Sequence, residues 1–156
     1  MVPLQEAIDT RAWLTGEFSE VFLQRNLINF RIRPSKFSRI DLTAIDEPEK
    51  ISPKLGLDAN VWLLKCDIVN LFKREVHCGY ITSKLRLVDE EGFEFMKVDD
   101  DHLLLQSQFS LSSGLNNFFS QELPPKIKRS GAIAFALPEF FEHLSIKVLD
   151  GTLSEL

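Results

Sequence analysis

The sequence has few of the residues on which metal centres and disulfide scaffolds depend. Its 156 residues include two cysteines, Cys66 and Cys78, and three histidines. Two cysteines are too few for a disulfide framework or for a zinc site built on cysteine pairs, and we expect both to be free thiols. The histidines stand apart in the chain, at His77, His102 and His143, without the short spacing of paired metal ligands. We therefore predict no metal ion and no cofactor.

Tyrosine and tryptophan are also scarce, with one Tyr and two Trp against 13 Phe. Phenylalanine has no polar group, so most of these rings are expected to fill a core. This composition argues against a carbohydrate-binding surface.

Long apolar runs are missing as well, since no stretch approaches the length needed to cross a membrane. The segment at residues 1–6 carries an acid rather than a basic segment followed by an apolar run, so no secretory signal is visible. We expect no membrane contact and a cytoplasmic location. The formal net charge of −5 gives no overall field that would attract nucleic acid.

Apolar residues recur at every second position in several segments, which is the period of a β-strand with one buried face. The alternation covers residues 28–33, 62–68, 103–111, 133–137 and 144–148. The acidic turn at residues 89–92 separates two further strand-like segments and predicts a hairpin. Short strands with frequent turns predict one all-β domain over residues 1–156, an antiparallel β-sandwich.

The N-terminal third is less regular. Leu4, Ala7 and Ile8 follow Pro3 at helical spacing, so a short helical or irregular lead-in is expected there. The spacing repeats weakly around Phe18, and the strands that follow are expected to be edge strands of the sandwich. The polar residues 46–54 are predicted to form a surface loop. A hairpin between residues 62–71 and 77–88 would place the two cysteines near one another.

The order of these segments from about residue 61 to residue 149 carries a resemblance. A strand ends at residues 68–71, and an acidic turn with glycine follows at 89–93. A proline-containing approach at 123–126 leads to a strand at 130–138, and a last strand occupies 144–148. This pattern resembles a family of small immunoglobulin-like domains of unknown function from bacteria and archaea. The resemblance implies an immunoglobulin-like β-sandwich that serves as a binding or structural module, and it supplies no catalytic residue.

The residues that could carry chemistry favour a structural interpretation. His77 next to Cys78 could form a base and a thiolate, but neither a nucleophile elbow nor a helix start is evident there. Cys66 shares a strand face with apolar residues and is expected to be buried. The acid clusters at residues 89–91 and 99–101 lack the spacing of a calcium loop and are predicted to be solvated turns. We do not expect an enzyme.

A concentration of basic residues predicts an alternative function. It consists of Arg31, Arg33, Lys36 and Arg39. Together with a stacking ring from Phe37, these cations would form a surface that follows a nucleic-acid backbone. The other interpretation is a solvated strand face whose cations complement the acidic turns.

Two pairs of adjacent rings give the main functional prediction. They are Phe118–Phe119 and Phe140–Phe141, both in turn-like regions. Adjacent strand residues point in opposite directions, so one ring of each pair is expected to be exposed, unless both cap the open ends of the sandwich. These four residues are the predicted partner-binding residues. The sequence thus predicts a non-catalytic protein-interaction or assembly module that binds a protein partner or a second copy, through an edge strand or an anchored Phe ring.

Overall fold

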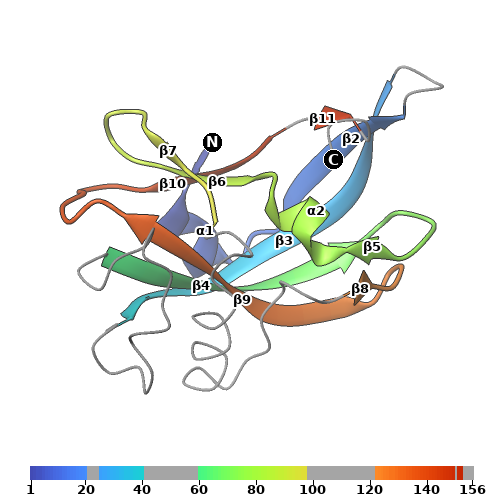
Figure 1. Ribbon diagram of the computed structural model, residues 1–156, viewed down its shortest axis with the longest axis horizontal. Helices are drawn as coiled ribbons and strands as arrows, with labels where there is room; N and C mark the ends of the chain where they lie inside the picture. Colours follow the sequence, from blue (N-terminus) through green and yellow to red (C-terminus); the bar gives the residue numbers. More distant parts are fainter. Residues whose placement is uncertain (21–24, 41–59, 98–121, 150, 153–156) are drawn as a thin grey trace, which may run out of the picture.

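The computed structural model describes residues 1–20, 25–40, 60–97, 122–149 and 151–152 (Figure 1). Most of these residues are in strands. In chain order the elements are β1 (Val2–Pro3), α1 (Leu4–Thr10), β2 (Leu14–Glu20), β3 (Arg25–Ile40), β4 (Asn60–Asn70), β5 (Val76–His77), α2 (Cys78–Thr82), β6 (Leu85–Val88), β7 (Glu94–Phe95), β8 (Glu122–Leu123), β9 (Lys128–Leu137), β10 (Ser145–Val148) and β11 (Gly151–Thr152).

The strands form two main sheets. The larger has the order β11–β2–β3–β4–β9 and the smaller has the order β1–β10–β6–β7, while β5 and β8 pair separately. Neighbouring strands run antiparallel, except that β11 lies parallel to β2. The predicted antiparallel β-sandwich is confirmed, and α1 confirms the helical lead-in. The predictions for residues 46–54, 99–101 and 103–111 lie outside the described residues.

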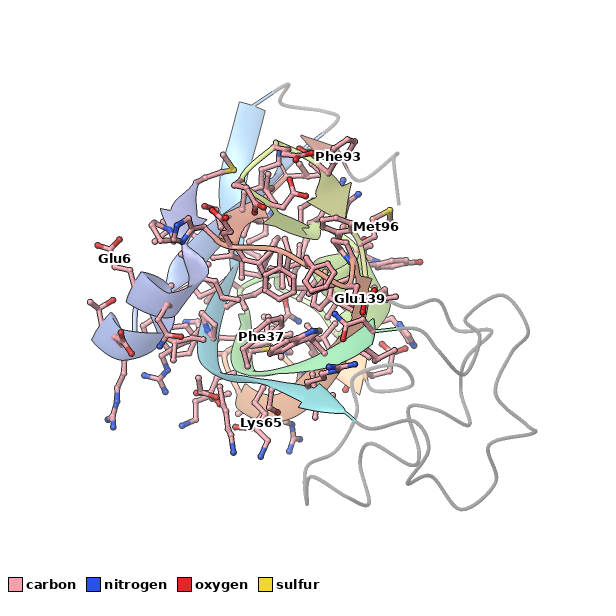
Figure 2. All side chains as sticks on the ribbon, turned by 90° about the vertical axis from the view of Figure 1, so that its left-hand side faces the viewer. Glu6, Phe37, Lys65, Phe93, Met96 and Glu139 are labelled. Atoms are coloured by element: carbon pink, nitrogen blue, oxygen red, sulfur yellow. The ribbon has the colours of Figure 1, made fainter. Side chains whose placement is uncertain are left out.

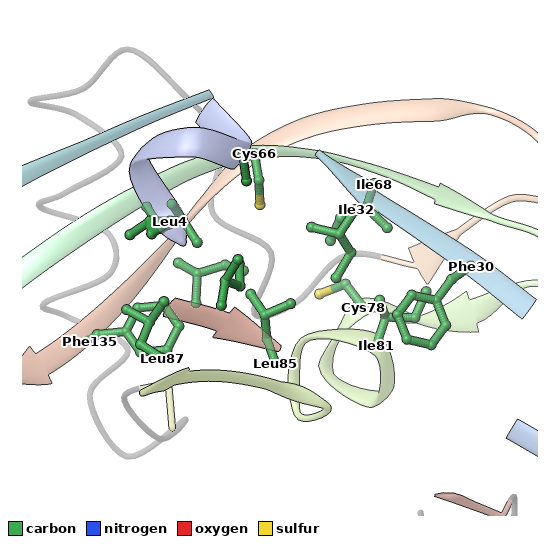
Figure 3. Close-up of a cluster of buried hydrophobic side chains, with 14 of the residues drawn as sticks. Leu4, Phe30, Ile32, Cys66, Ile68, Cys78, Ile81, Leu85, Leu87 and Phe135 are labelled. Carbon is green, nitrogen blue, oxygen red and sulfur yellow. The ribbon is translucent and has the colours of Figure 1, made fainter. Parts of the chain in front are cut away.

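The hydrophobic core lies between the two sheets (Figure 3). Leu64, Cys66 and Ile68 of β4 alternate into it from the larger sheet. Leu85 and Leu87 of β6 face them from the smaller sheet. The period-two pattern of the sequence therefore marks the buried face, and the burial of Cys66 is confirmed. Each such side chain contributes roughly 1.5–3 kcal/mol to folding through its removal from water.

Helix α1 closes the core beside β3. Its residues Leu4 and Ala7 are buried in the core cluster. The helix ends at Arg11, which adopts the left-handed conformation at φ 52° and donates its backbone N–H to the carbonyl of Ile8. Because β2 begins at Leu14, opposite Ile32, the later half of β3 lies beside α1 rather than beside β2.

The position of β3 differs from the prediction. Strand β3 lies in the middle of the five-stranded sheet, not at an edge, and Phe18 belongs to strand β2 rather than to a helical segment. A register shift between Pro34 and Lys36 accommodates the proline, which has no N–H to donate to a neighbouring strand. Glycine is required at position 16, because a Cβ atom there would lie 1.8 Å from Cζ of Phe30.

The hairpin considered between residues 62–71 and 77–88, which would have placed the two cysteines near one another, does not form. Strand β4 belongs to the larger sheet and β6 to the smaller one, so the two segments face each other across the core instead of pairing. Cys66 and Cys78 are buried and are not joined in a disulfide, and burial raises the pKa of the Cys66 thiol well above its usual value. Within the described residues, no helix is long and apolar enough to span a membrane.

Candidate functional site

The turn between β6 and β7 is built around Asp89. Its Oδ1 accepts hydrogen bonds from the backbone N–H groups of Glu91 at 3.0 Å and Phe93 at 2.9 Å. Gly92 supplies the left-handed conformation that the turn requires, with φ 89°. The predicted hairpin is confirmed here. Its geometry leaves the ring of Phe93 62% exposed.

A second acid of this turn, Glu90, holds the connection between β9 and β10. Its Oε2 accepts the backbone N–H groups of Glu142 at 3.2 Å and His143 at 3.4 Å. Hydrogen bonding lowers the pKa of the Glu90 carboxyl, first from its own backbone N–H and then from those of Glu142 and His143. The turn at residues 89–93 and the segment at residues 138–144 are therefore joined. We call this end of the sandwich the loop end (Figure 1).

The predicted pair Phe140–Phe141 lies in the loop end. Phe140 is 85% exposed. Phe141 turns inward and packs edge-on against Trp62, with ring centroids 5.5 Å apart. Trp62 in turn stacks on Phe37 at 4.7 Å with an interplanar angle of 14°. The expectation of one exposed ring is confirmed for this pair, whereas Phe118 and Phe119 lie outside the described residues.

A pocket of about 360 Å³ opens beside these rings. The residues that line it include Leu4, Phe37, Phe141, Glu142 and Leu144. Figure 2 looks onto this end of the molecule, with Phe37 near the centre and Phe93, Met96 and Glu139 above it and to its right. The loop end thus combines an apolar hollow with exposed apolar side chains.

Two buried polar atoms belong to side chains on the core-facing side of β4. Asn60 donates from Nδ2 to the carbonyl of Pro138 at 2.9 Å. Within the described part of the chain, Oδ1 of Asn60 and Nε1 of Trp62 have no hydrogen-bond partner. A buried polar atom without a partner costs about 1–3 kcal/mol.

The predicted basic residues do not form one surface. Arg31 and Lys36 are exposed on the outer face of the larger sheet, away from the core. Arg33 shares that face but is bound to Asp67, with Nη2 2.8 Å from Oδ2, and lies over the Trp13 ring at 4.4 Å. Arg39 is opposite Trp62, on the other face. Nucleic-acid binding by this strand stays a prediction.

Asp67 is ionised by its surroundings. Partial burial raises the pKa of its carboxyl, but hydrogen bonds from Ser130 and Arg33 and the charges of Arg33 and Lys128 outweigh burial and lower it. Both carboxylate oxygens have partners, since Oδ1 accepts from Ser130 and Oδ2 from Arg33. The Arg33–Asp67 pair is therefore a fixed, internally neutral unit on the outer face.

The His77–Cys78 pair is part of the scaffold. A helix does begin at Cys78, contrary to the sequence-based expectation, but it has five residues and its first side chain is fully buried. His77 caps it by accepting the N–H of Gly79 on Nδ1 at 3.0 Å. Among the described residues, no group of three or more His, Cys, Asp or Glu side chains is placed to hold a metal ion.

Three contributors to the loop end, Trp62, Glu90 and Phe93, were not predicted from the sequence as site residues. Trp62 was assigned to a strand face, but its stacking on Phe37 was not foreseen. Glu90 was treated as a solvated charge. The signal available for Phe93 was its position directly after an acidic glycine turn, which exposes a ring at a hairpin tip.

The fold and site together define a mostly-β domain, a sandwich of antiparallel sheets with an aromatic-lined pocket at one end. No protein-family model matches the sequence, and no curated protein matches it. Among solved structures, the chain is similar to the secreted protein MPT63 of Mycobacterium tuberculosis, with 13% sequence identity, a TM-score of 0.48, and coverage of 88% of this chain and 92% of that chain. It is also similar to a conserved hypothetical protein of Bacillus anthracis, with 11% identity, a TM-score of 0.45, and coverage of 85% and 94%.

Proposed function

We propose that this domain is a non-catalytic protein-interaction module that binds its partner through the loop end. The observation that carries the proposal is the exposure of apolar side chains there, with Phe140 85% and Phe93 62% exposed, and of Met96 just after β7, which is 53% exposed. Apolar surface in contact with water is unfavourable, and the free energy falls when a partner covers it. Phe140 is the anchor residue of the proposal.

The loop end is preorganised for binding. Phe141, the residue after Phe140, packs against Trp62. The backbone N–H groups of the next two residues, Glu142 and His143, donate to Glu90. A ring presented from a fixed backbone loses little conformational freedom when it binds, so more of its contact energy appears as affinity. The neighbouring pocket can receive a side chain of the partner in return.

The charge of the rim indicates the chemistry of the partner. Glu91, Glu139 and Glu142 are exposed around the apolar residues, and Glu90 is exposed beside them. A surface with acidic groups around an apolar centre complements a segment that carries Lys or Arg beside apolar side chains. We therefore infer a protein partner with a basic, apolar binding segment.

Edge-strand pairing receives less support. The end strands β1, β7 and β11 are two residues long, which leaves little backbone to pair with another chain. The remaining end strand, β9, is longer, but Lys97 bridges to it at Phe135. Of the two mechanisms predicted from the sequence, the anchored ring is the better supported.

Two further features agree with a binding role. The buried Cys78 and the capping role of His77 leave this pair unsuited to attack a substrate. The resemblance of residues 61–149 to small immunoglobulin-like domains implies a binding or structural module, and membership of that family is part of this proposal.

The test is affinity capture from nuclease-treated lysate with the whole chain as bait, run in parallel with the variants Phe140→Ser and Ile127→Ser. Ile127 is 47% exposed and lies outside the loop end, so it is the matched control. We expect a protein that is retained by the wild type and by Ile127→Ser and is lost from Phe140→Ser. Equal retention by both variants would refute the proposal, and so would capture that disappears for all baits after nuclease treatment. The mass of the wild type in solution shows whether the partner is a second copy of this chain.

A further inference from the structure

Cations are concentrated on the outer face of the larger sheet. Strand register places them in rows across β3, β4 and β9. Arg31 and Lys128 lie on either side of Val69, and two rows further along Lys36 lies directly opposite Lys65. The row between them holds Arg33, Asp67 and Ser130. A chain with a net charge of −5 thus gathers positive charge on one face.

The opposition of Lys36 and Lys65 is unfavourable for folding. Side chains directly opposite one another on neighbouring strands are about 5 Å apart at Cβ, and like charges at that separation destabilise the sheet. Asp67, the acid of the middle row, is already bound by Arg33 and Ser130 and does not neutralise the lysines. An anion that lies between the rows would remove this repulsion.

A pocket continues this face at its border with α1. It has a volume of about 290 Å³ and is lined by Arg11, Arg33, Ser35 and Asp67, with Ile8 and Pro34 below. Ser35 stands at the irregularity of β3 and donates its hydroxyl to the carbonyl of Lys65 at 3.1 Å. The pocket and the lysine row are therefore adjacent. Figure 2 shows Lys65 on the side of the sheet that faces away from the core.

We propose that this face is a binding site for a ligand with a chain of phosphate groups, held by Arg31, Lys36 and Lys65. Arg31 and Lys36 are separated by roughly 15 Å along the strand, given a rise of about 3.3 Å per residue. A chain of phosphates can follow this length of the face and place a negative charge beside each of the cations. Arg33 keeps its place through Asp67 and Trp13 and supplies a fixed positive edge to the adjacent pocket.

The aromatic residues favour a ligand that is recognised by its phosphates alone. Proteins that hold single-stranded nucleic acid add stacking rings to their cations. Phe37 lies on the opposite face, where it stacks on Trp62, and the Trp13 ring is covered by Arg33. No stacking ring is thus offered by the described residues of this face. The basic surface predicted from the sequence is therefore corrected: Phe37 and Arg39 do not belong to it, and Lys65 does.

The test is titration of the whole chain with linear inorganic polyphosphate, followed by isothermal calorimetry at several salt concentrations. The test variant is Lys36→Gln with Lys65→Gln. The control variant is Lys73→Gln with Arg74→Gln, which removes the same charge from the exposed bend after β4. Thermal melting of the wild type and both variants is the check that all three chains are folded. We expect the test variant to melt at the same temperature as the wild type or higher, because the repulsion is gone.

The expected result is binding by the wild type and the control, and at least about tenfold weaker binding by the test variant, whose salt slope falls by about one for each lysine removed. Lack of binding to the folded wild type at low salt would overturn the proposal, as would equal losses in test and control variants. A single-stranded DNA oligonucleotide added as competitor distinguishes the sources of phosphate. Displacement assigns the site to a nucleic-acid backbone, and lack of displacement assigns it to free polyphosphate.

Discussion

Phe37 of β3 and Trp62 of β4 stack with their ring centroids 4.7 Å apart and nearly parallel. The pair joins neighbouring strands at the end of the sandwich where Phe141 packs against the tryptophan. Aromatic pairs of this geometry add about 0.5–1.5 kcal/mol beyond the area that they bury. The stack is therefore the support on which the exposed Phe140 is presented.

Replacement of Trp62 should separate the contribution of its rings from that of its N–H. Trp62→Ala is expected to lower the free energy of unfolding by about 3–5 kcal/mol, as for other large aromatic residues in cores. Trp62→Phe keeps the stack and removes the N–H, which has no hydrogen-bond partner among the described residues, so it should cost less than half as much. Urea denaturation of both variants is the measurement. Equal losses would show that the indole N–H has a role that the structure does not assign.

Protonation of Glu90 should loosen the loop end. The pKa of this carboxyl is lowered in the folded chain, so its contribution to stability is fully present above the usual glutamate range. That contribution is lost as the pH falls through the lowered pKa, where folded and unfolded chains are both protonated. The melting temperature of Glu90→Gln should therefore lie below that of the wild type near neutral pH, and the difference should vanish in acid.

Glu91→Gln is the control for this titration, because it removes the same charge from the same turn. Hydrogen exchange of the N–H groups of Glu142 and His143 should quicken in Glu90→Gln and not in Glu91→Gln. A difference in melting temperature that persists unchanged in acid would contradict the role given to Glu90.

The parts of this fold that could be predicted are those with a local signal. The alternation at residues 62–68 and 133–137 marks strands because the strand period is a property of neighbouring residues. The turn at residues 89–92 is equally local. The central position of β3 and the separation of β4 from β6 depend on which strands pair, and pairing is decided by packing across the whole core.

The candidate site could be predicted in part for the same reason. The pairing of an exposed Phe140 with an inward Phe141 was predicted from the adjacency of the two rings, although both lie in the connection between β9 and β10 rather than in a strand. The hydrogen bond from Glu142 to Glu90 spans 52 residues and arises from the assembled sheets. The sequence gives no sign of this hydrogen bond at either residue, because Glu90 is one of several acids in a turn.

The contact between Gly16 and Phe30 predicts a large effect from a small substitution. A Cβ atom at position 16 would overlap the Phe30 ring, so Gly16→Ala should cost about 1–3 kcal/mol or more through overpacking. Gly92→Ala, where nothing lies within 4 Å, should cost only the strain of its left-handed backbone, roughly 1–2 kcal/mol. Guanidinium denaturation measures both.

A second substitution identifies the cause. Phe30→Leu in the Gly16→Ala chain should recover part of the loss, because the smaller side chain makes room for the methyl group. If the double variant is less stable than the wild type by the sum of the two single losses, the two positions do not interact.

The opposed lysines predict a stabilising charge reversal. Lys36→Glu would face Lys65 with the opposite charge and should raise the free energy of unfolding by roughly 0.2–1 kcal/mol at low salt. Lys36→Gln only removes the repulsion, so its free energy of unfolding should lie between those of the wild type and Lys36→Glu. The gain should shrink as salt is added. If the Lys36→Glu chain is less stable than the wild type at low salt, the side chains of Lys36 and Lys65 point apart and their charges do not repel one another.

The central claim is that Phe140 anchors a protein partner at the loop end. The most direct measurement is the dissociation constant of the captured partner for the wild type, Phe140→Ser and Ile127→Ser, determined by calorimetry on purified proteins. The account predicts an affinity about 30-fold weaker for Phe140→Ser, as for an interface hot spot of about 2 kcal/mol, and an unchanged affinity for Ile127→Ser. Equal affinities for all three chains, with the domain folded in each, would contradict it.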